Sequence, residues 1–206
     1  MQTNILSAQA AQALPQAVAV LQGGGLVAFP TDTVYGVGAL AFEAAAVQRL
    51  YEVKGRSAEK AIAVLVAREA DLAQVARALT PSARTLALRF WPGPLTLVVP
   101  KHPALPEAVS ALPTVGVRQP DHAVAQALLA LTGPLAVTSA NLSGQPPATT
   151  AEAVLAQLAG RIDLLLDGGS TSGGVASTVI DCTAEPPVIL RPGPISVAEI
   201  ETALKI

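Results

Sequence analysis

Of the 206 residues in this chain, 51% are hydrophobic, only 3% are aromatic and 14% are charged, and the net charge is −2. This length allows one large domain or two small ones, and the apolar content suffices for a buried α/β core built from Ala, Val, Leu and Ile. The near-neutral charge argues against a general attraction to nucleic acid, which is typical of basic proteins. Any contact with RNA would therefore be local or made by a partner.

The cysteine content and the N-terminus indicate a cellular compartment. Cys182 is the only cysteine, so no disulfide can form within the chain. This fits a reducing cytosol, and we expect a buried structural thiol there. The N-terminus lacks the basic and apolar segments of a signal peptide, and every apolar stretch is interrupted before the roughly 20 residues that cross a bilayer. We therefore expect a soluble, cytoplasmic protein.

The first half of the chain predicts helices alternating with short apolar strands. A helix is expected from about Pro15 to the run Gly23-Gly24-Gly25, which cannot continue it. The continuous apolar run Ile62 to Val66 predicts a strand covered on both faces. The other elements expected here are a strand over Leu26 to Phe29 and helices over Glu43 to Val53, Glu69 to Ala78 and Pro81 to Phe90.

The second half continues this alternation after the break at Trp91-Pro92-Gly93-Pro94. Asp121 is expected to cap a helix over Ala123 to Leu131. Further strands are expected over Leu95 to Val99, Val115 to Arg118, Leu135 to Thr138, Leu164 to Leu166, Ser177 to Cys182 and Val188 to Leu190, and helices over Ala151 to Leu158 and Val197 to Leu204. The pattern predicts a twisted α/β sheet, mixed because several connections are too short for parallel crossovers. Since no linker or repeat divides the chain, we expect one domain over 1–206, with its core at about 14–196.

Polar motifs follow these elements, at loop ends where binding groups are usually placed. Together they offer hydroxyls, an amide and three permanent cations, but no Ser/His/Asp triad, metal-ligand cluster or Walker-type loop. Such a site suits a phosphate-bearing ligand held by charge and hydrogen bonds. The five motifs are Pro30 to Gly36, Lys54-Gly55-Arg56, Thr138 to Asn141, Ser177 to Asp181 and Arg191-Pro192-Gly193.

Each motif also has a purely structural interpretation. Lys54 and Arg56 follow a helix, where cations complement the helix dipole by about 0.3–1 kcal/mol each. With Lys60 nearby, they could instead grip a triphosphate. The Thr31 to Thr33 segment could be an ordinary turn. The loop that begins at Thr138 directly follows a buried strand, where open α/β sheets bind ligands, and we favour a functional role for it.

Read together, the motifs closely resemble the YrdC-like family, specifically its threonylcarbamoyl-AMP synthases. The resemblance covers nearly the whole chain from Gly23 to Gly193, with all motifs in family order. It rests on the turn Pro30 to Gly36, the pair Lys54/Arg56, Trp91 to Pro94, Gly116 to Pro120, Ser139 to Gly144, Ser177 to Asp181 and Arg191 to Gly193.

The resemblance implies a YrdC-like sheet with a concave ligand-binding face and a reaction joining L-threonine, bicarbonate and ATP. The products would be threonylcarbamoyl-AMP and pyrophosphate, with Mg²⁺ carried by ATP. A separate transferase complex would then modify tRNA, and this chain would be the short, single-domain form. The implied catalytic residues are Lys54 and Arg56; the implied threonine ligands are Thr33, Arg118, Thr138 and Ser177; and the implied ATP ligands are Lys54, Arg56, Lys60, Thr114, Ser139, Ala140, Asn141, Ala148 and Arg191.

Two departures from the family pattern leave alternatives open. Ser57 stands where many members have Pro, and Leu65 stands where many have a His that contacts threonine. The second departure is compatible with an enzyme that adenylates another carbamate, and an RNA-binding module is a further alternative. Arg118 ends an apolar strand and would be costly to bury without a carboxylate. We expect that carboxylate to be threonine's, the alternative being a protein group such as Asp121 or Asp181.

Overall fold

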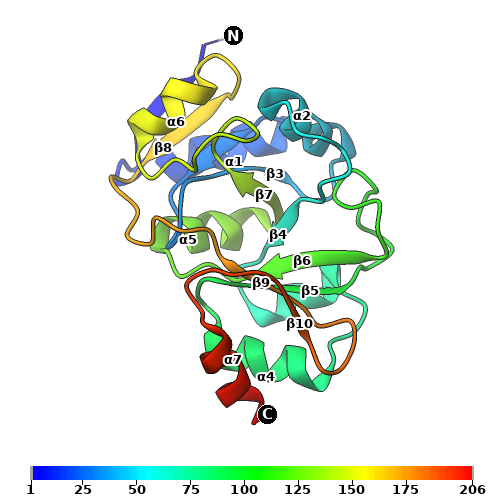
Figure 1. Ribbon diagram of the computed structural model, residues 1–206. Helices are drawn as coiled ribbons and strands as arrows, with labels where there is room; N and C mark the ends of the chain where they lie inside the picture. Colours follow the sequence, from blue (N-terminus) through cyan, green and yellow to red (C-terminus); the bar gives the residue numbers. More distant parts are fainter. Residues whose placement is uncertain (1, 206) are drawn as a thin grey trace.

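The computed structural model describes residues 2–205, in which one ten-stranded mixed sheet is flanked by helices (Figure 1). The strand order is β1-β8-β2-β3-β7-β4-β6-β5-β9-β10. This confirms the predicted α/β class. The single domain over 1–206 stays a prediction, and its ends, Met1 and Ile206, lie outside the described residues. The strands are β1 (Asn4–Ser7), β2 (Val27–Phe29), β3 (Gly36–Leu40), β4 (Ala63–Leu65), β5 (Leu95–Pro100), β6 (Thr114–Arg118), β7 (Leu135–Ser139), β8 (Leu164–Asp167), β9 (Thr178–Asp181) and β10 (Val188–Arg191).

Both directions of strand pairing occur, as the short connections predict. Strands β1 and β2 each run parallel to β8, β4 runs parallel to β6, and β5 runs parallel to β9. The remaining neighbours pair antiparallel, including β7 between β3 and β4. This arrangement brings the carboxyl ends of β4 and β6 to the same edge of the sheet, with β9 two strands away.

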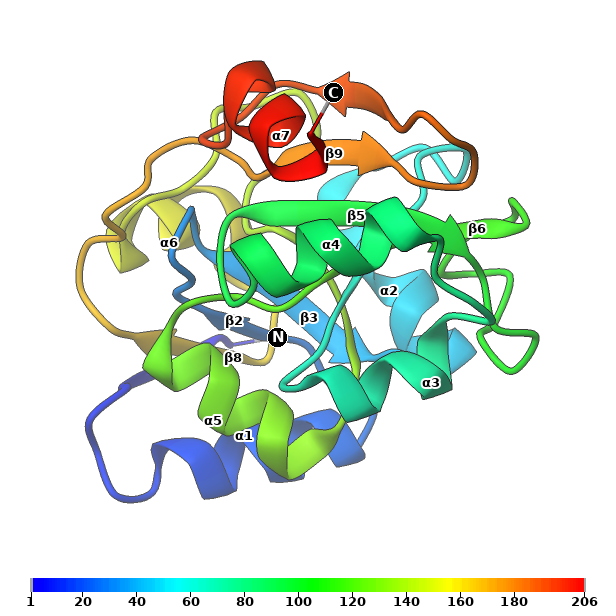
Figure 2. The same cartoon turned by 90° about the horizontal axis from the view of Figure 1, so that it is seen from below.

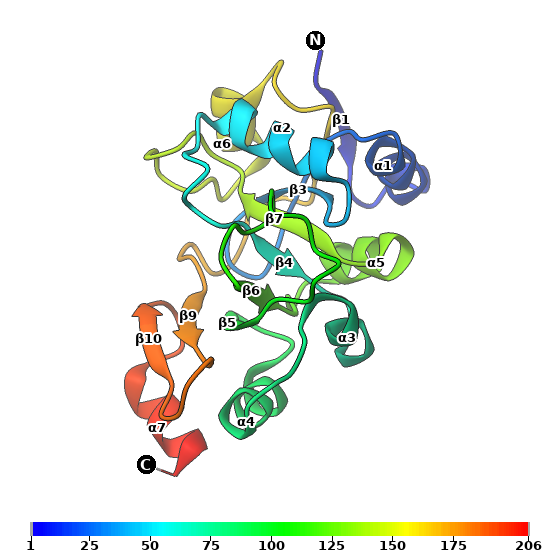
Figure 3. The same cartoon turned by 90° about the vertical axis from the view of Figure 1, so that its right-hand side faces the viewer.

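Helices cover both faces of the sheet (Figure 3). Helices α1 and α5 pack together on one side, and α2 and α6 lie on the other. At the far end of the sheet, α4 and α7 lie side by side (Figure 2). Within the described residues, no helix is long and apolar enough to cross a membrane. The helices are α1 (Ala13–Gln22), α2 (Ala44–Lys54), α3 (Leu72–Val75), α4 (Pro81–Phe90), α5 (Ala123–Thr132), α6 (Ala151–Leu158) and α7 (Val197–Leu204), with a 3-10 turn at Glu69–Asp71.

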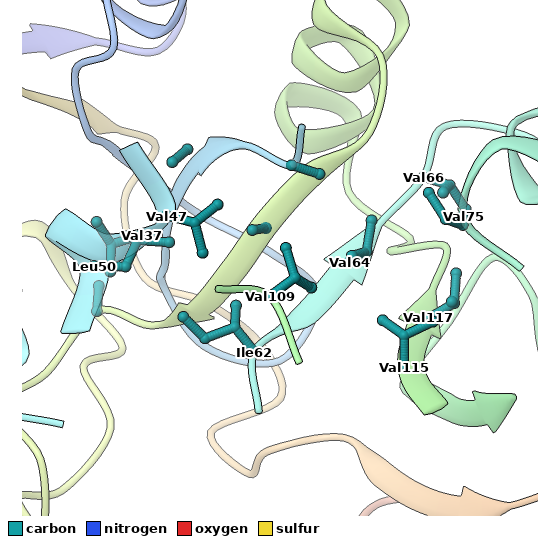
Figure 4. Packing of buried hydrophobic residues seen from close by; sticks show 14 of the residues in the cluster. Val37, Val47, Leu50, Ile62, Val64, Val66, Val75, Val109, Val115 and Val117 are labelled. Atoms are coloured by element: carbon teal, nitrogen blue, oxygen red, sulfur yellow. The ribbon is translucent and has the colours of Figure 1, made fainter. Parts of the chain in front are cut away.

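The core consists mainly of aliphatic side chains, as the low aromatic content requires. Around β4, the side chains of Val64, Val117 and Ile62 pack with Val109 (Figure 4). Branched side chains such as these are stiff and suit a pleated surface. Apolar contacts continue on both sides of β4, which confirms its prediction as a strand buried on two faces.

Strands β1 and β3 were not predicted. Strand β3 contains Gly36 and Gly38, residues that normally weaken a strand. They are needed here because a Cβ at Gly36 would lie 2.7 Å from Cγ1 of Val137 on β7. The glycines therefore permit close approach of two strands, a tertiary requirement that local patterns do not reveal.

Two helix predictions are wrong in detail. The helix expected over Glu69 to Ala78 is limited to a 3-10 turn and the short α3, because Ala76 turns extended and bridges to Lys101. Asp121 does not cap α5: His122 takes the N-cap position without a side-chain hydrogen bond. The backbone N–H of Asp121 instead donates to Oδ1 of Asp32, 3.0 Å away.

Candidate active site

A cavity of about 290 Å³ lies among the ends of the central strands. Its wall comes from the 31–36 turn, from β4 to β7, and from β9 and β10. The motifs that were far apart in sequence therefore meet at one place. The predicted site residues that line it are Thr33, Arg56, Arg118, Thr138, Ser139, Ser177 and Arg191.

Arg118 is held rigidly at the end of β6. Its side chain is buried, and burial is the main cause that lowers its pKa. Nε donates to the carbonyl of Gly93 over 2.9 Å, and Nη1 donates to Oγ1 of Thr33 over 2.9 Å. Nη2 lies 2.5 Å from Oδ1 of Asp32. A protein carboxylate therefore balances the buried charge of Arg118, which is the alternative and not the favoured expectation of threonine's carboxylate. The residue is Asp32, and neither Asp121 nor Asp181.

Ser177 and Arg191 form a second polar group in the wall. Nε and Nη2 of Arg191 both donate to the carbonyl of Ser177, over 3.1 and 2.7 Å. Nη2 also lies 3.2 Å from Oγ of Ser177. That hydroxyl oxygen is 2.8 Å from Oγ1 of Thr96 on β5. The start of β9 is thus fixed to β10 through one guanidinium.

Arg56 lines the cavity just beyond α2. Gly55 ends this helix in the left-handed conformation (φ 58°), a conformation that is strained for a residue with a side chain. The turn directs Arg56 back over the following segment, where Nε donates to the carbonyl of Lys60 and Nη2 to that of Ala61. Burial lowers the Arg56 pKa. Lys60 itself is exposed and does not line the cavity.

Lys54, which was predicted with Arg56 as an ATP ligand, does not line the cavity. Its side chain is buried, and Nζ donates to the main-chain carbonyls of Ser139 and Asn141. Burial, with a smaller effect from the Arg56 charge, lowers the pKa of Lys54 to about 8. Lys54 therefore fixes the backbone of the loop that carries Ser139.

The remaining predicted ATP ligands do not line the cavity. Thr114 begins β6, opposite Pro100, and is therefore at the other end of the strand from Arg118. Ala140 and Ala148 are buried and fix the backbone of Tyr35, which accepts from the Ala140 N–H and donates to the Ala148 carbonyl. The amide nitrogen of Asn141 donates to the carbonyls of Leu142 and Gln145. Ligand contacts by these residues, and by Lys54 and Lys60, stay predictions.

The cavity has a net positive character. Within residues 2–205, Arg118 is the only arginine of its wall that forms an ion pair; Arg56 and Arg191 donate to carbonyl or hydroxyl oxygens. Burial lowers the pKa of Arg191, and the charges of Arg118 and Arg56 lower it further. Two neighbouring cations with no carboxylate partner in this part of the chain favour an anionic ligand.

Sequence reasoning missed Asp32 and Thr96. Asp32 was interpreted as turn chemistry, although its carboxylate supports the buried arginine. Thr96 is the one hydroxyl residue in the apolar segment Leu95 to Val99, and this isolated hydroxyl was the signal available. Among the lining residues, Leu65 and Val137 give the cavity an apolar part.

Cys182, His102 and His122 do not line the cavity. Cys182 is fully buried, which confirms the predicted buried thiol, and this burial raises its pKa to about 12. His102 is partly buried, and its Nδ1 accepts from the backbone of Ala104. His122 takes the N-cap position of α5, and burial lowers its pKa.

Similarity to known proteins agrees with this geometry. The chain is 46% identical, over 91% of its length, to the threonylcarbamoyl-AMP synthase of Pyrococcus abyssi. It is 44% identical, over 96% of its length, to a putative threonylcarbamoyl-AMP synthase of Mycobacterium leprae. The crystal structure of P. abyssi Sua5 complexed with L-threonine superposes on 99% of the chain with a TM-score of 0.94 and 42% identity.

The lengths of these relatives differ. The chain spans 56% of the P. abyssi synthase, 61% of the solved Sua5 chain and 90% of the M. leprae protein. Residues 19–193 match the model of the Sua5/YciO/YrdC (telomere recombination) family. The match covers most of the chain and includes every residue of the cavity wall, so the chain belongs to the Sua5/YciO/YrdC family.

Proposed function

We propose that the chain is an L-threonylcarbamoyladenylate synthase, which converts L-threonine, bicarbonate and ATP into threonylcarbamoyl-AMP and pyrophosphate. The observation that carries the proposal is the composition of the cavity. Arg56 and Arg191 supply positive charge for a triphosphate, and Arg118 with Thr33 supplies a rigid group of donors beside them. The relatives named threonylcarbamoyl-AMP synthase support the same activity.

Threonine is proposed to bind at the buried end of the cavity, around Arg118. Three of the five guanidinium N–H groups are used within the protein, one each toward Gly93, Thr33 and Asp32, so two remain for the carboxylate of threonine. Thr138 and Ser177 would complete the site with their hydroxyl groups.

ATP is proposed to lie toward Arg56 and Arg191, with Mg²⁺ carried on its phosphates. Arginine suits this role because its planar group can contact two phosphate oxygens at once. Lys54 would act as a positioning residue, through the backbone of the Ser139 loop. The wider set proposed to surround ATP comprises Lys60, Thr114, Ser139, Ala140, Asn141 and Ala148.

The proposed chemistry needs alignment more than proton transfer. Bicarbonate supplies CO₂ and hydroxide; the nitrogen of threonine's neutral amine bonds to the carbon of CO₂, and the hydroxide takes the proton that the amine loses, forming water. The product is a carbamate, which is already an anionic nucleophile. Its oxygen attacks the α-phosphorus of ATP, the bond from that phosphorus to the bridging oxygen breaks, and pyrophosphate leaves. The cations of the wall would balance the charge on the leaving group.

The direct test is to measure pyrophosphate and the adenylate after incubation with ATP, Mg²⁺, bicarbonate and one amino acid at a time. Release should require both threonine and bicarbonate. Equal release without bicarbonate would contradict the carbamate mechanism. Equal release with serine would favour the alternative of an enzyme that adenylates another carbamate. Leu65 in the cavity wall supports that alternative.

The product would pass to a threonylcarbamoyl-transferase complex that modifies tRNA. With a net charge of −2, this chain would itself bind tRNA only weakly or indirectly. Tight, salt-dependent RNA binding in the absence of adenylate formation would favour the RNA-binding alternative. The cytoplasmic location stays a prediction, which cell fractionation would test.

A further inference from the structure

Thr96 and Ser177 form a buried hydroxyl pair in the cavity wall. Their oxygen atoms are 2.8 Å apart, and the two residues are only 5% and 6% exposed. The parallel register of β5 and β9 pairs Thr96 with Val179, and Ser177, two residues before Val179 and on the same face, lies diagonally opposite Thr96. Both residues also line the cavity, so a ligand there can reach the pair.

The hydrogen-bond inventory leaves one donor for a ligand. Each hydroxyl carries one hydrogen, and only one of the two hydrogens can serve the bond between them. The Oγ of Ser177 also accepts from Nη2 of Arg191, which can only donate. Within residues 2–205, neither hydroxyl contacts another acceptor. One hydroxyl hydrogen therefore remains, and the cavity is where it can find an acceptor.

The charge of Arg191 favours Ser177 as the residue that presents this hydrogen. If Thr96 donates to Ser177, the serine oxygen accepts from Thr96 and from the guanidinium together. Hydrogen bonds in a chain polarise one another, so the O–H of Ser177 becomes a stronger donor. Both acceptor positions of its oxygen are then filled, and Ser177 can donate to a ligand oxygen but cannot accept from a ligand amine.

We propose that Thr96 is a positioning residue of the threonine site, which fixes Ser177 as a hydrogen-bond donor to a carboxylate or carbamate oxygen of the substrate. The inference rests on the proposed function, because it takes threonine as the ligand. It assigns Ser177 to an anionic oxygen rather than to the amine of threonine.

A double-mutant cycle tests this role, with Thr96→Val, Ser177→Ala and the combined variant. The readouts are the threonine dissociation constant from calorimetry and the two KM values. Thr96→Val should weaken threonine binding about 10-fold, a typical cost for a lost charge-assisted hydrogen bond. The KM for ATP should change less than about 2-fold, because the hydroxyl serves the other substrate. Thr96→Ser, which retains the hydroxyl, should restore binding to within about 3-fold.

The cycle separates positioning from packing. In the Ser177→Ala background, Thr96→Val should add less than about 2-fold, because the group that Thr96 positions is already missing. The same 10-fold loss in both backgrounds would overturn the proposal, as would a failure of Thr96→Ser to restore binding. Thr85→Val, an exposed threonine on α4, is the matched control and should leave both KM values unchanged.

The same measurements distinguish failure of this inference from failure of the proposed function. A wild-type protein that binds threonine but forms no adenylate would overturn the reaction, while the cycle would still decide the role of Thr96. A wild-type protein that binds no threonine would overturn both.

Discussion

Arg118 reaches the cavity with its charge already balanced by Asp32, whose Oδ1 lies 2.5 Å from Nη2 of the arginine. The same oxygen accepts from the backbone N–H of Asp121, 3.0 Å away. One carboxylate therefore connects the 31–36 turn with the end of β6 and the segment that leads into α5. The side chains of both partners are largely buried, at 7% and 14% exposure, so the pair matters for the fold as well as for any ligand.

We predict that Asp32→Ala will lower the free energy of unfolding by about 3 kcal/mol, because it leaves a buried, uncompensated cation. Asp32→Asn should cost less, since its amide oxygen can still accept from Arg118. Urea unfolding measures both. Arg68→Ala is the control: it removes an ion pair whose arginine is 73% exposed and should cost less than about 1 kcal/mol. A similar loss in the control and in Asp32→Ala would contradict a special role for the buried pair.

We predict that Arg56→Ala will reduce turnover by roughly 100-fold or more, the cost of losing a charge-assisted contact to phosphate in the transition state. The same substitution should lower the free energy of unfolding by only about 1 kcal/mol, because Arg56 donates to two carbonyls and to no carboxylate. Steady-state kinetics and thermal unfolding separate the two effects. Arg161→Ala, which removes an exposed arginine that donates to the Val53 carbonyl, is the control. Near-normal turnover of Arg56→Ala would mean that Arg56 only complements the dipole at the end of α2 and does not contact phosphate.

The lowered pKa of Lys54 predicts that the stability of the protein depends on pH. Its pKa is about 8 in the folded protein, below the value of about 10.4 in an unfolded chain. Between these values the unfolded state binds more protons, so stability rises with pH across this window. The stability of wild type relative to Lys54→Met should therefore increase by up to about 3 kcal/mol from pH 8 to 10.5. The neutral amine still has hydrogens for the carbonyls of Ser139 and Asn141.

Urea unfolding of both proteins at several pH values measures this difference and cancels titrations that they share. A stability difference that stays constant from pH 8 to 10.5 would mean that Lys54 keeps an ordinary pKa despite burial. A difference that decreases over this range would mean that its two carbonyl acceptors favour the charged form more than burial disfavours it.

The sequence predicted most elements because their local signals agree with their tertiary environment. Helix α4 begins at Pro81 and ends at Phe90 as expected, since Pro favours the first turn and Thr80 caps it through its hydroxyl. Strand β3 was missed because glycine opposes a strand locally and is required there by the close approach of β7 and of Phe29 on β2. Helix α3 is shorter than expected because Ala76 pairs with Lys101, a partner distant in sequence.

For the candidate site, the sequence predicted which loop residues line the cavity better than it predicted which groups their side chains contact. Thr33, Arg118 and Ser177 were expected near one another and do line one cavity. The sequence could not show that Asp32 would neutralise Arg118, because the two are 86 residues apart and Asp121 and Asp181 were equally suitable partners. It also could not show that Lys54 donates to the carbonyls of Ser139 and Asn141 instead of lining the cavity, since no sequence pattern fixes the direction of a lysine at the end of a helix.

The substitution Arg118→Lys tests two roles of this residue, its support of the fold and its proposed binding of threonine, and we predict effects on both. A lysine cannot reach the Gly93 carbonyl, Thr33 and Asp32 together, so the melting temperature should fall by roughly 2–8 °C. The threonine KM should rise at least roughly 10-fold, because an ammonium group cannot replace a bidentate fork, while the ATP KM changes little. Kinetics measured well below the melting temperature exclude unfolding as the cause. An equal rise in both KM values would mean that Arg118 supports the site only through Asp32 and the fold, and that the carboxylate of threonine binds elsewhere.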